Sequence, residues 1–168
     1  NWLGNFFNRY RANQNPITTE LSEATRKRIS EQFRSLFNSN QNAEVVALFE
    51  QLPKEMKSIS KDPEVSWQIA ESYRSLGQPS LSLEFYKKAA LSDKSADRFR
   101  SNFWIAAIAS KQASETKAKR GEQSKIRNAS MMAEKSDNEM RKIWTKLTSD
   151  ERATLMTALG PELKNITA

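Results

Sequence analysis

Residues 72–89 read SYRSLGQPSLSLEFYKKA and contain a Gly-Gln-Pro break between two amphipathic runs. The residues that set the spacing on either side of this break are Tyr73, Gly77, Ser82, Tyr86 and Ala89. Large and small side chains alternate at helical intervals, as they do when two helices pack closely against each other. The stretch therefore predicts an antiparallel helical hairpin.

The hairpin pattern occurs a second time, upstream of the first. Shifting the chain by 37 residues lays FRSLFNSNQNAEVVALFEQL over AESYRSLGQPSLSLEFYKKA. The shift pairs Phe33 with Ala70, Leu36 with Tyr73, Asn40 with Gly77, Val45 with Ser82, Phe49 with Tyr86 and Leu52 with Ala89. Asparagine and glycine are the residues that most readily enter the left-handed conformation that ends a helix. Two consecutive hairpins are expected, each with a left-handed residue at its turn.

Over residues 63–94 the chain resembles the tetratricopeptide repeat family. The residues at the family's spacing are Ala70, Tyr73, Gly77, Tyr86 and Ala89. Three positions depart from the family pattern: Trp67 lies one place late, Ser82 replaces an alanine, and Lys94 replaces the terminal proline. The resemblance implies an all-α, right-handed stack of helical hairpins, with two repeats, a looser third unit and a cap.

No stretch shows the two-residue alternation of a strand, which also indicates an all-α fold. Capping signals occur at Asp62-Pro63, at Ser136 with Glu139 and at Thr148 with Glu151. The predicted helices cover residues 22–39, 43–56, 63–76, 79–91, 96–118, 122–135, 137–147 and 149–159. In the capping hairpin, we expect Met140, Ile143, Trp144 and Leu147 to pack against Leu155, Met156 and Leu159.

Three regions are expected along the chain. Residues 1–21 form an amphipathic segment and a linker, residues 22–160 form the helical domain, and residues 161–168 form a tail. The aromatic stretch NWLGNFFNRYRA at the start is expected either to fold onto the helical array or to serve as a membrane-proximal or self-association helix. The start at Asn1 raises the hypothesis that an upstream part carried a targeting or anchoring segment.

The composition excludes several kinds of chemistry. The 168 residues include no cysteine and no histidine, which removes disulfides, thiolate nucleophiles, the common zinc sites and imidazole acid–base catalysis. Neither a glycine-rich phosphate loop nor a paired-carboxylate constellation stands out, although spacing alone does not exclude serine–lysine catalysis. No stretch approaches the roughly 20 apolar residues of a membrane span, so the chain is expected to be soluble. We expect a non-enzyme without metal or cofactor.

The function expected from these features is that of an adaptor that docks a segment of another protein, or a second copy of itself. By the resemblance, one helix of each hairpin would line a concave binding surface. The candidate partner-binding residues there are Arg34, Phe37, Trp67, Glu71, Arg74 and Phe103. The alternative for Trp67 is packing between hairpins, with Glu71 and Arg74 as a solvated pair. The family's lysine–asparagine carboxylate clamp does not carry over, because Trp67 and Glu71 occupy its positions.

Positive charge is concentrated in one third of the chain. The net charge is +7, and residues 98–146 hold twelve basic side chains against five acidic ones. The run KQASETKAKRGEQSKIR contains a candidate basic patch of Lys117, Lys119, Arg120, Lys125 and Arg127. Such a run is typical of a solvated helix end. Nucleic-acid binding is the alternative, although the run lacks aromatic residues for stacking on bases.

Overall fold

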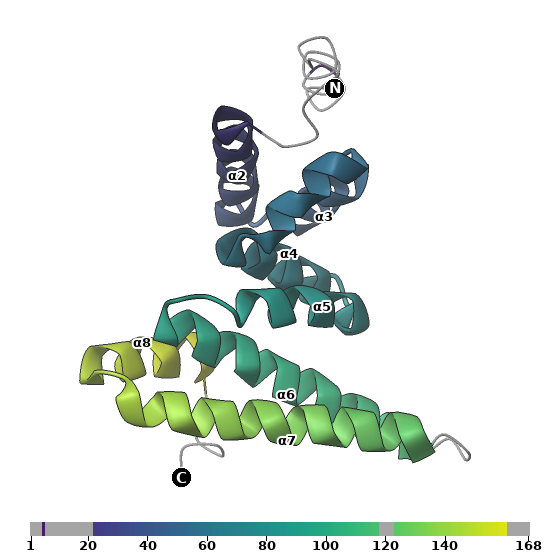
Figure 1. The fold of residues 1–168 in the computed structure, drawn as a ribbon, viewed down its shortest axis with the longest axis vertical. Coiled ribbons are helices and arrows are strands. Elements are labelled where there is room, and N and C mark those ends of the chain that lie inside the picture. Colours follow the sequence, from purple (N-terminus) through teal and green to yellow (C-terminus); the bar gives the residue numbers. More distant parts are fainter. Residues whose placement is uncertain (1–4, 6–21, 118–122, 161–168) are drawn as a thin grey trace.

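The computed structural model describes residues 22–117 and 123–160, together with Asn5. In this part of the chain all regular structure is helical, so the predicted all-α class is confirmed (Figure 1). The elements in chain order are α2 (Glu23–Asn38), α3 (Asn42–Gln51), the 3-10 helix η1 (Lys54–Lys61), α4 (Pro63–Ser75), α5 (Pro79–Ala89), α6 (Ser95–Lys117), α7 (Gln123–Lys146) and α8 (Ser149–Leu159).

Local signals define several helix ends as the sequence predicts. The Asp62 side chain accepts hydrogen bonds from the backbone N–H groups of Glu64 and Val65 at the start of α4. Thr148 and Glu151 form a complete capping box at the start of α8. After α2 and α4, the chain turns through Asn40 (φ 57°) and Gly77 (φ 75°), both in the left-handed region. The two predicted turns therefore share one backbone geometry.

The connection after α3 differs from the prediction. A single helix over residues 43–56 is expected, but α3 ends at Gln51 and η1 begins at Lys54. Pro53 explains the break, because a proline disfavours helical backbone in the residue before it, and Leu52 is extended (φ −60°, ψ 136°). The separate 3-10 helix places Met56 and Ile59 in the core, where both are 0% exposed.

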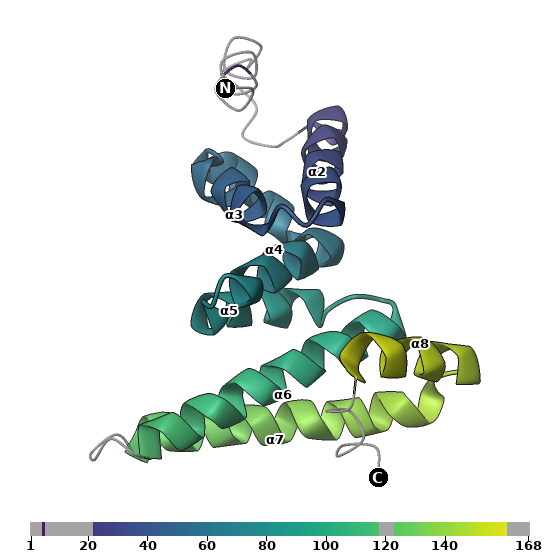
Figure 2. The same cartoon turned by 180° about the vertical axis from the view of Figure 1, so that it is seen from behind.

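The break predicted near residue 136 is also wrong. Residues 122–135 and 137–147 are expected as two helices, but α7 runs unbroken from Gln123 to Lys146. Ser136 lies inside this helix and is 6% exposed, so it is not a cap. The reason is tertiary packing: α7 lies antiparallel beside the long helix α6, and breaking it would interrupt this contact (Figures 1 and 2).

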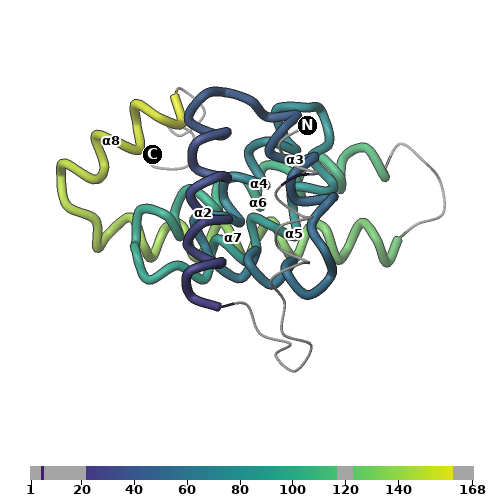
Figure 3. The backbone as a smooth tube through the Cα atoms, turned by 90° about the horizontal axis from the view of Figure 1, so that it is seen from above, coloured from purple at the N-terminus to yellow at the C-terminus, as the bar shows by residue number. Residues whose placement is uncertain are grey.

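Successive helices stack on one another along the long axis of the molecule. Figures 1 and 2 show α2 and α3 at one end, α4 and α5 in the middle, and the α6–α7 pair across the other end. Seen along the stack in Figure 3, the α6–α7 pair extends past α5 on one side, with α8 beside its opposite end. This order leaves α6 between α4 and α5 on one side and α7 on the other.

The core is built from the positions that the hairpin pattern predicts. Tyr73 and Tyr86 are 4% and 0% exposed. The small residues that allow close approach, Ala70, Ser82 and Ala89, are buried as well. At the far end, the predicted capping residues join a single cluster with Phe99 and Phe103; the predicted members present are Met140, Ile143, Trp144, Leu147, Leu155, Met156 and Leu159. These packing predictions are confirmed.

Candidate functional site

Tyr86 on α5 is the centre of a hydrogen-bonded group with two residues of α4. Its hydroxyl donates to Glu71 Oε1 at 2.5 Å and accepts from Arg74 Nε at 2.9 Å. Arg74 Nη2 donates to Glu71 Oε2 at 2.8 Å. Burial, together with the neighbouring Glu71 carboxylate, raises the pKa of Tyr86, so the phenol keeps the proton that it donates.

Two arginines stacked on tryptophans join α4 to α6. The Arg74 guanidinium lies 3.7 Å from the centroid of the Trp104 ring, and the Arg100 guanidinium lies 3.8 Å from that of Trp67. The Tyr86 ring lies between the two indoles, with centroids 5.5 Å from Trp67 and 6.5 Å from Trp104. We call Trp67, Glu71, Arg74, Tyr86, Arg100 and Trp104 the arginine–aromatic cluster. Each partly buried stack of this kind contributes about 0.5–2 kcal/mol.

Arg100 is held less completely than Arg74. Its Nη2 lies 3.1 Å from Asp97 Oδ1, one turn earlier on α6. Burial lowers the pKa of Arg100, and the Asp97 carboxylate opposes that effect. Within the described part of the chain, the Arg100 Nε has no hydrogen-bond partner. Arg74 is therefore the better fixed of the two stacked arginines.

A groove of about 410 Å³ opens beside Trp104, between α6 and the turn from α4 to α5. We call it the α4–α6 groove. The residues that give its chemical character are Arg74, Pro79, Trp104, Ala107, Ile108 and Lys111. The lining surface is mainly apolar, and Arg74 and Lys111 add two cations to it. Such a groove suits an apolar side chain that has a polar neighbour.

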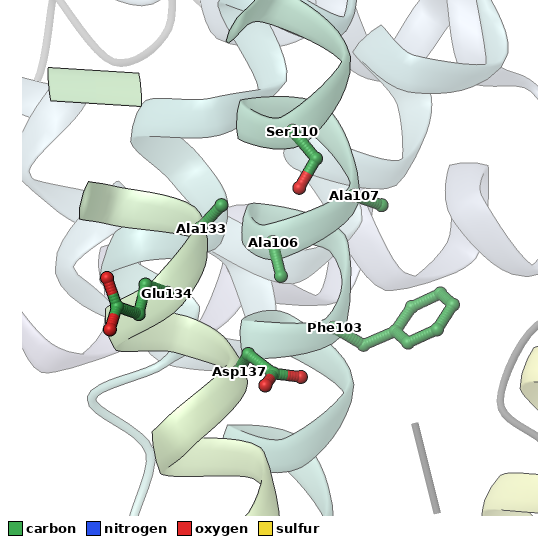
Figure 4. A pocket seen from close by; sticks show the side chains of 7 residues that line it. All are labelled: Phe103, Ala106, Ala107, Ser110, Ala133, Glu134 and Asp137. Carbon is green, nitrogen blue, oxygen red and sulfur yellow. The ribbon is translucent and has the colours of Figure 1, made fainter. Parts of the chain in front are cut away.

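A second groove, of about 340 Å³, lies between α6 and α7 (Figure 4). We call it the α6–α7 groove. Its lining residues are Phe103, Ala106, Ala107, Ser110, Ala133, Glu134 and Asp137. Figure 4 shows the short side chains of Ala106, Ser110 and Ala133 between the two helices, with the two carboxylates on α7. Because Ala107 lines both grooves, they lie on either side of one surface, which we call the α6 face.

The structure separates the predicted partner-binding residues into two groups. Trp67, Glu71 and Arg74 lie together in the arginine–aromatic cluster. Trp67 is packed between helices, as in the alternative interpretation. The side chains of Glu71 and Arg74, at 17% and 29% exposure, are more enclosed than a solvated pair.

The other three predicted residues are not members of this cluster, although the Phe103 ring lies 5.0 Å from the ring of its member Trp104. Arg34 pairs with Glu64 at 3.0 Å, and both side chains are 53% exposed. The Glu64 carboxylate raises the pKa of Arg34. Phe37 packs against the core cluster of α2, α3 and α4. Phe103 is 2% exposed, which leaves a partner almost none of its surface. Their role in binding stays a prediction.

Sequence reasoning missed much of this site, including Arg100, Trp104, Ala107 and Lys111. The sequence did contain a signal for two of them. Arg100 and Trp104 lie four residues apart on one predicted helix, and they repeat the basic and aromatic residue types of Arg74 and Trp67. The choice of stacking partner could not be read from that spacing. It depends on which helix lies next to α4.

Several predicted features fall outside the described residues. These are Lys119 and Arg120, the aromatic segment and linker of residues 1–21, and the tail of residues 161–168. Lys117 ends α6, but only its backbone is described. Lys125 and Arg127 lie on the first turns of α7 and are exposed. The basic patch and the domain boundaries remain predictions.

The described residues contain no group of three or more carboxylates that could hold a metal ion. Among the helices of residues 22–117 and 123–160, none has the length and apolar character to cross a membrane. Comparison of the chain with protein-family models, curated proteins and solved structures gives no match.

Proposed function

We propose that the chain is a non-catalytic adaptor that docks a segment of a partner protein on its α6 face and thereby helps to assemble a larger complex. The observation that carries this proposal is the α4–α6 groove, which is lined by Trp104 with the Arg74 guanidinium stacked on its ring. Tryptophan and arginine are enriched among the residues that dominate binding energy at protein interfaces. The groove offers both at one apolar site.

The contacts of Arg74 support a binding role because they fix one wall of the α4–α6 groove before a partner binds. Two hydrogen bonds and a ring stack fix the guanidinium before any partner arrives. Ordering a long side chain on binding costs roughly 0.5–1.5 kcal/mol, and a side chain that is already ordered avoids most of this cost. A partner would therefore meet a rigid wall.

We also propose the tetratricopeptide-like arrangement that the sequence resembles. Support comes from the turns after α2 and α4, which use left-handed residues at equivalent places, Asn40 and Gly77. The pairs α2–α3, α4–α5 and α6–α7 would then be three hairpins of one stack. In that arrangement α2, α4 and α6 are the first helices of their hairpins, and the stacks between α4 and α6 join successive units.

A second candidate is a basic surface that binds an anionic polymer such as nucleic acid. It is favoured by six basic side chains along α7: Lys125, Arg127, Lys135, Arg141, Lys142 and Lys146. Part of this charge is already engaged, since Arg141 pairs with Asp137 and Lys142 with Glu139. The adaptor is the better supported of the two functions, since the α6 face combines two grooves with charged side chains.

The test is a crosslinking pull-down from the native cell with Ala107→Arg as the blocking variant. Ala107 is exposed and lines both grooves, so a long side chain there fills the α6 face without removing a core contact. The matched control is Ala153→Arg at an exposed position of α8. The adaptor function requires that Ala107→Arg loses the crosslinked protein while Ala153→Arg keeps it.

A third variant separates the two candidate functions. Lys125→Gln combined with Arg127→Gln removes two exposed charges from α7 and leaves both grooves unchanged. If only this variant loses its ligand, and the ligand binds with the steep salt dependence of phosphate contacts, the nucleic-acid function replaces the adaptor.

A further inference from the structure

The charged residues that line the two grooves differ in sign: Arg74 and Lys111 outnumber Glu115 in the α4–α6 groove, whereas Glu134 and Asp137 line the α6–α7 groove. Resting on the docking function proposed above, we infer that the occupant of this face is an amphipathic helix whose apolar stripe has acidic side chains along one edge and basic side chains along the other. The acidic edge lies against the α4 side of α6, and the basic edge lies against α7.

On the α4 side of the face, the groove is lined by two cations, Arg74 and Lys111, and one carboxylate, Glu115. Arg74 uses Nε and Nη2 for Tyr86 and Glu71, which leaves Nη1 without a hydrogen-bond partner in the described residues. Lys111 is loosely held, since its Nζ lies 3.9 Å from Glu115 Oε1 and its side chain is 73% exposed. Glu115 also lines the groove and offsets part of this charge, but its own side chain is 64% exposed. Two cations therefore remain available to carboxylates.

The α7 side of the face is negative. Glu134 and Asp137 line the α6–α7 groove, and both come from α7 (Figure 4). Asp137 accepts a hydrogen bond from Arg141 Nε at 3.0 Å, and 35% of its side chain remains exposed. Glu134 is exposed, and within the described part of the chain it forms no ion pair. A basic edge of a docked segment would meet these two carboxylates.

Small side chains lie between the two charged sides. Ala107 and Ser110 are small and exposed, so a backbone can approach α6 closely there. Trp104 and Ile108 stand beside them in the α4–α6 groove and would contact the apolar stripe. A helix with its side chains is about 10–12 Å across, which lets one helix centred on Ala107 present its two edges to both sides at once.

This arrangement selects against helices with only one sign of charge. A helix with two acidic edges would bring carboxylates against Glu134 and Asp137, and a helix with two basic edges would bring cations against Arg74 and Lys111. Like charges opposed across an interface reduce affinity for the wrong partner. The mixed pattern is the one that satisfies both grooves.

The test is a selection from helical peptides displayed on phage, with the full chain as target. Each peptide has about 16 residues, or about 24 Å as a helix, with a fixed apolar stripe and randomised edges. Peptides that also bind the Ala107→Arg variant are discarded, so that only binders of the α6 face remain. Among those kept, we expect acidic residues enriched along one edge and basic residues along the other.

Two charge reversals then test the assignment of each side. Against Lys111→Glu, the selected mixed peptides should bind about fivefold more weakly, and peptides with two basic edges should be enriched. Against Glu134→Lys, the same peptides should weaken by a similar factor, with two acidic edges enriched. The matched control is Lys135→Glu, an exposed reversal on α7 that lines neither groove, and it should leave the selection unchanged.

The outcomes distinguish this inference from the function on which it rests. If no peptide binds in a way that Ala107→Arg abolishes, the docking function fails and the inference fails with it. If peptides bind the α6 face without an edge pattern, or if the two reversals change nothing, docking stands and the inference alone is overturned.

Discussion

Arg74 of α4 lies over the ring of Trp104 of α6, with 3.7 Å between the guanidinium carbon and the ring centroid. The same guanidinium donates from Nε to the hydroxyl of Tyr86 on α5 and from Nη2 to the carboxylate of Glu71 on α4. One side chain thus ties three consecutive helices together. It also forms the wall of the groove that we propose for docking.

Arg74→Lys should destabilise the fold although it keeps the positive charge. An ammonium cannot reproduce two directed bonds from a planar fork together with a stack on an indole. We expect the free energy of unfolding, measured by urea denaturation, to fall by about 1–3 kcal/mol. The control is Arg141→Lys in the exposed pair with Asp137, where a change under about 0.5 kcal/mol is expected. Equal effects at the two positions would contradict the role given to the stack.

Stability should fall in alkali because of the buried tyrosines. An unfolded tyrosine releases its proton near pH 10, whereas burial holds the pKa of Tyr86 above that value. Above pH 10 the unfolded chain therefore binds fewer protons than the folded one. The free energy of unfolding decreases there, by at most about 1.4 kcal/mol per pH unit for one group. Below pH 10 this contribution is constant.

Unfolding measurements between pH 8 and about 12 on Tyr86→Phe check this prediction. The variant should be less stable at pH 8, because Glu71 and Arg74 lose a shared partner, but its stability should decline less above pH 10. Burial raises the pKa of Tyr73 to about 12, with the hydrogen bond to Glu50 adding to the shift. Tyr73→Phe should therefore also flatten the profile, in the window from pH 10 to about 12. Profiles parallel to that of the unchanged chain would refute the assignment.

The features predicted correctly from the sequence are those determined by residues close together along the chain. The left-handed turn residues Asn40 and Gly77, the Asp62 cap and the buried tyrosines all follow from short-range spacing and side-chain size. By contrast, the pairing of Arg74 with Trp104 joins residues 30 positions apart. Either arginine of the cluster could stack on several aromatic rings, and only the packing of α4 beside α6 makes the choice.

The unbroken helix α7 shows that tertiary packing can also override a local sequence signal. Ser136 and Glu139 have the spacing of a capping box, and so do Thr148 and Glu151, but only the second pair caps a helix. The spacing is identical in both cases. The difference is that residues on both sides of Ser136 pack on α6, which favours continuing the helix, whereas α7 ends before Thr148.

This difference predicts unequal costs for two similar substitutions. Thr148→Ala removes the hydroxyl that accepts from the Glu151 N–H and should lower the free energy of unfolding by about 0.5–2 kcal/mol. Ser136→Ala improves helix propensity inside α7 and removes no cap, so its effect should be smaller. Urea denaturation of both variants makes the comparison. A larger loss at Ser136 would indicate that α7 is divided there after all.

The turn after α4 gives the cleanest test of backbone conformation. Gly77 has φ +75°, and a Cβ added there would meet no atom within 4 Å. Any cost of substitution therefore comes from the left-handed conformation and not from steric conflict with neighbours. Asparagine tolerates this conformation, while a β-branched residue does so poorly.

Gly77→Val should accordingly lower the free energy of unfolding by about 1–2 kcal/mol more than Gly77→Asn does. Asn40→Val is the matched substitution at the equivalent turn, since Asn40 has φ 57° and is exposed, and it should show a similar penalty relative to the asparagine already there. Guanidinium unfolding of the three variants decides the question. If valine and asparagine prove equally stable at residue 77, the turn can adopt another backbone geometry, and the equivalence of the two hairpin turns no longer supports a repeated unit.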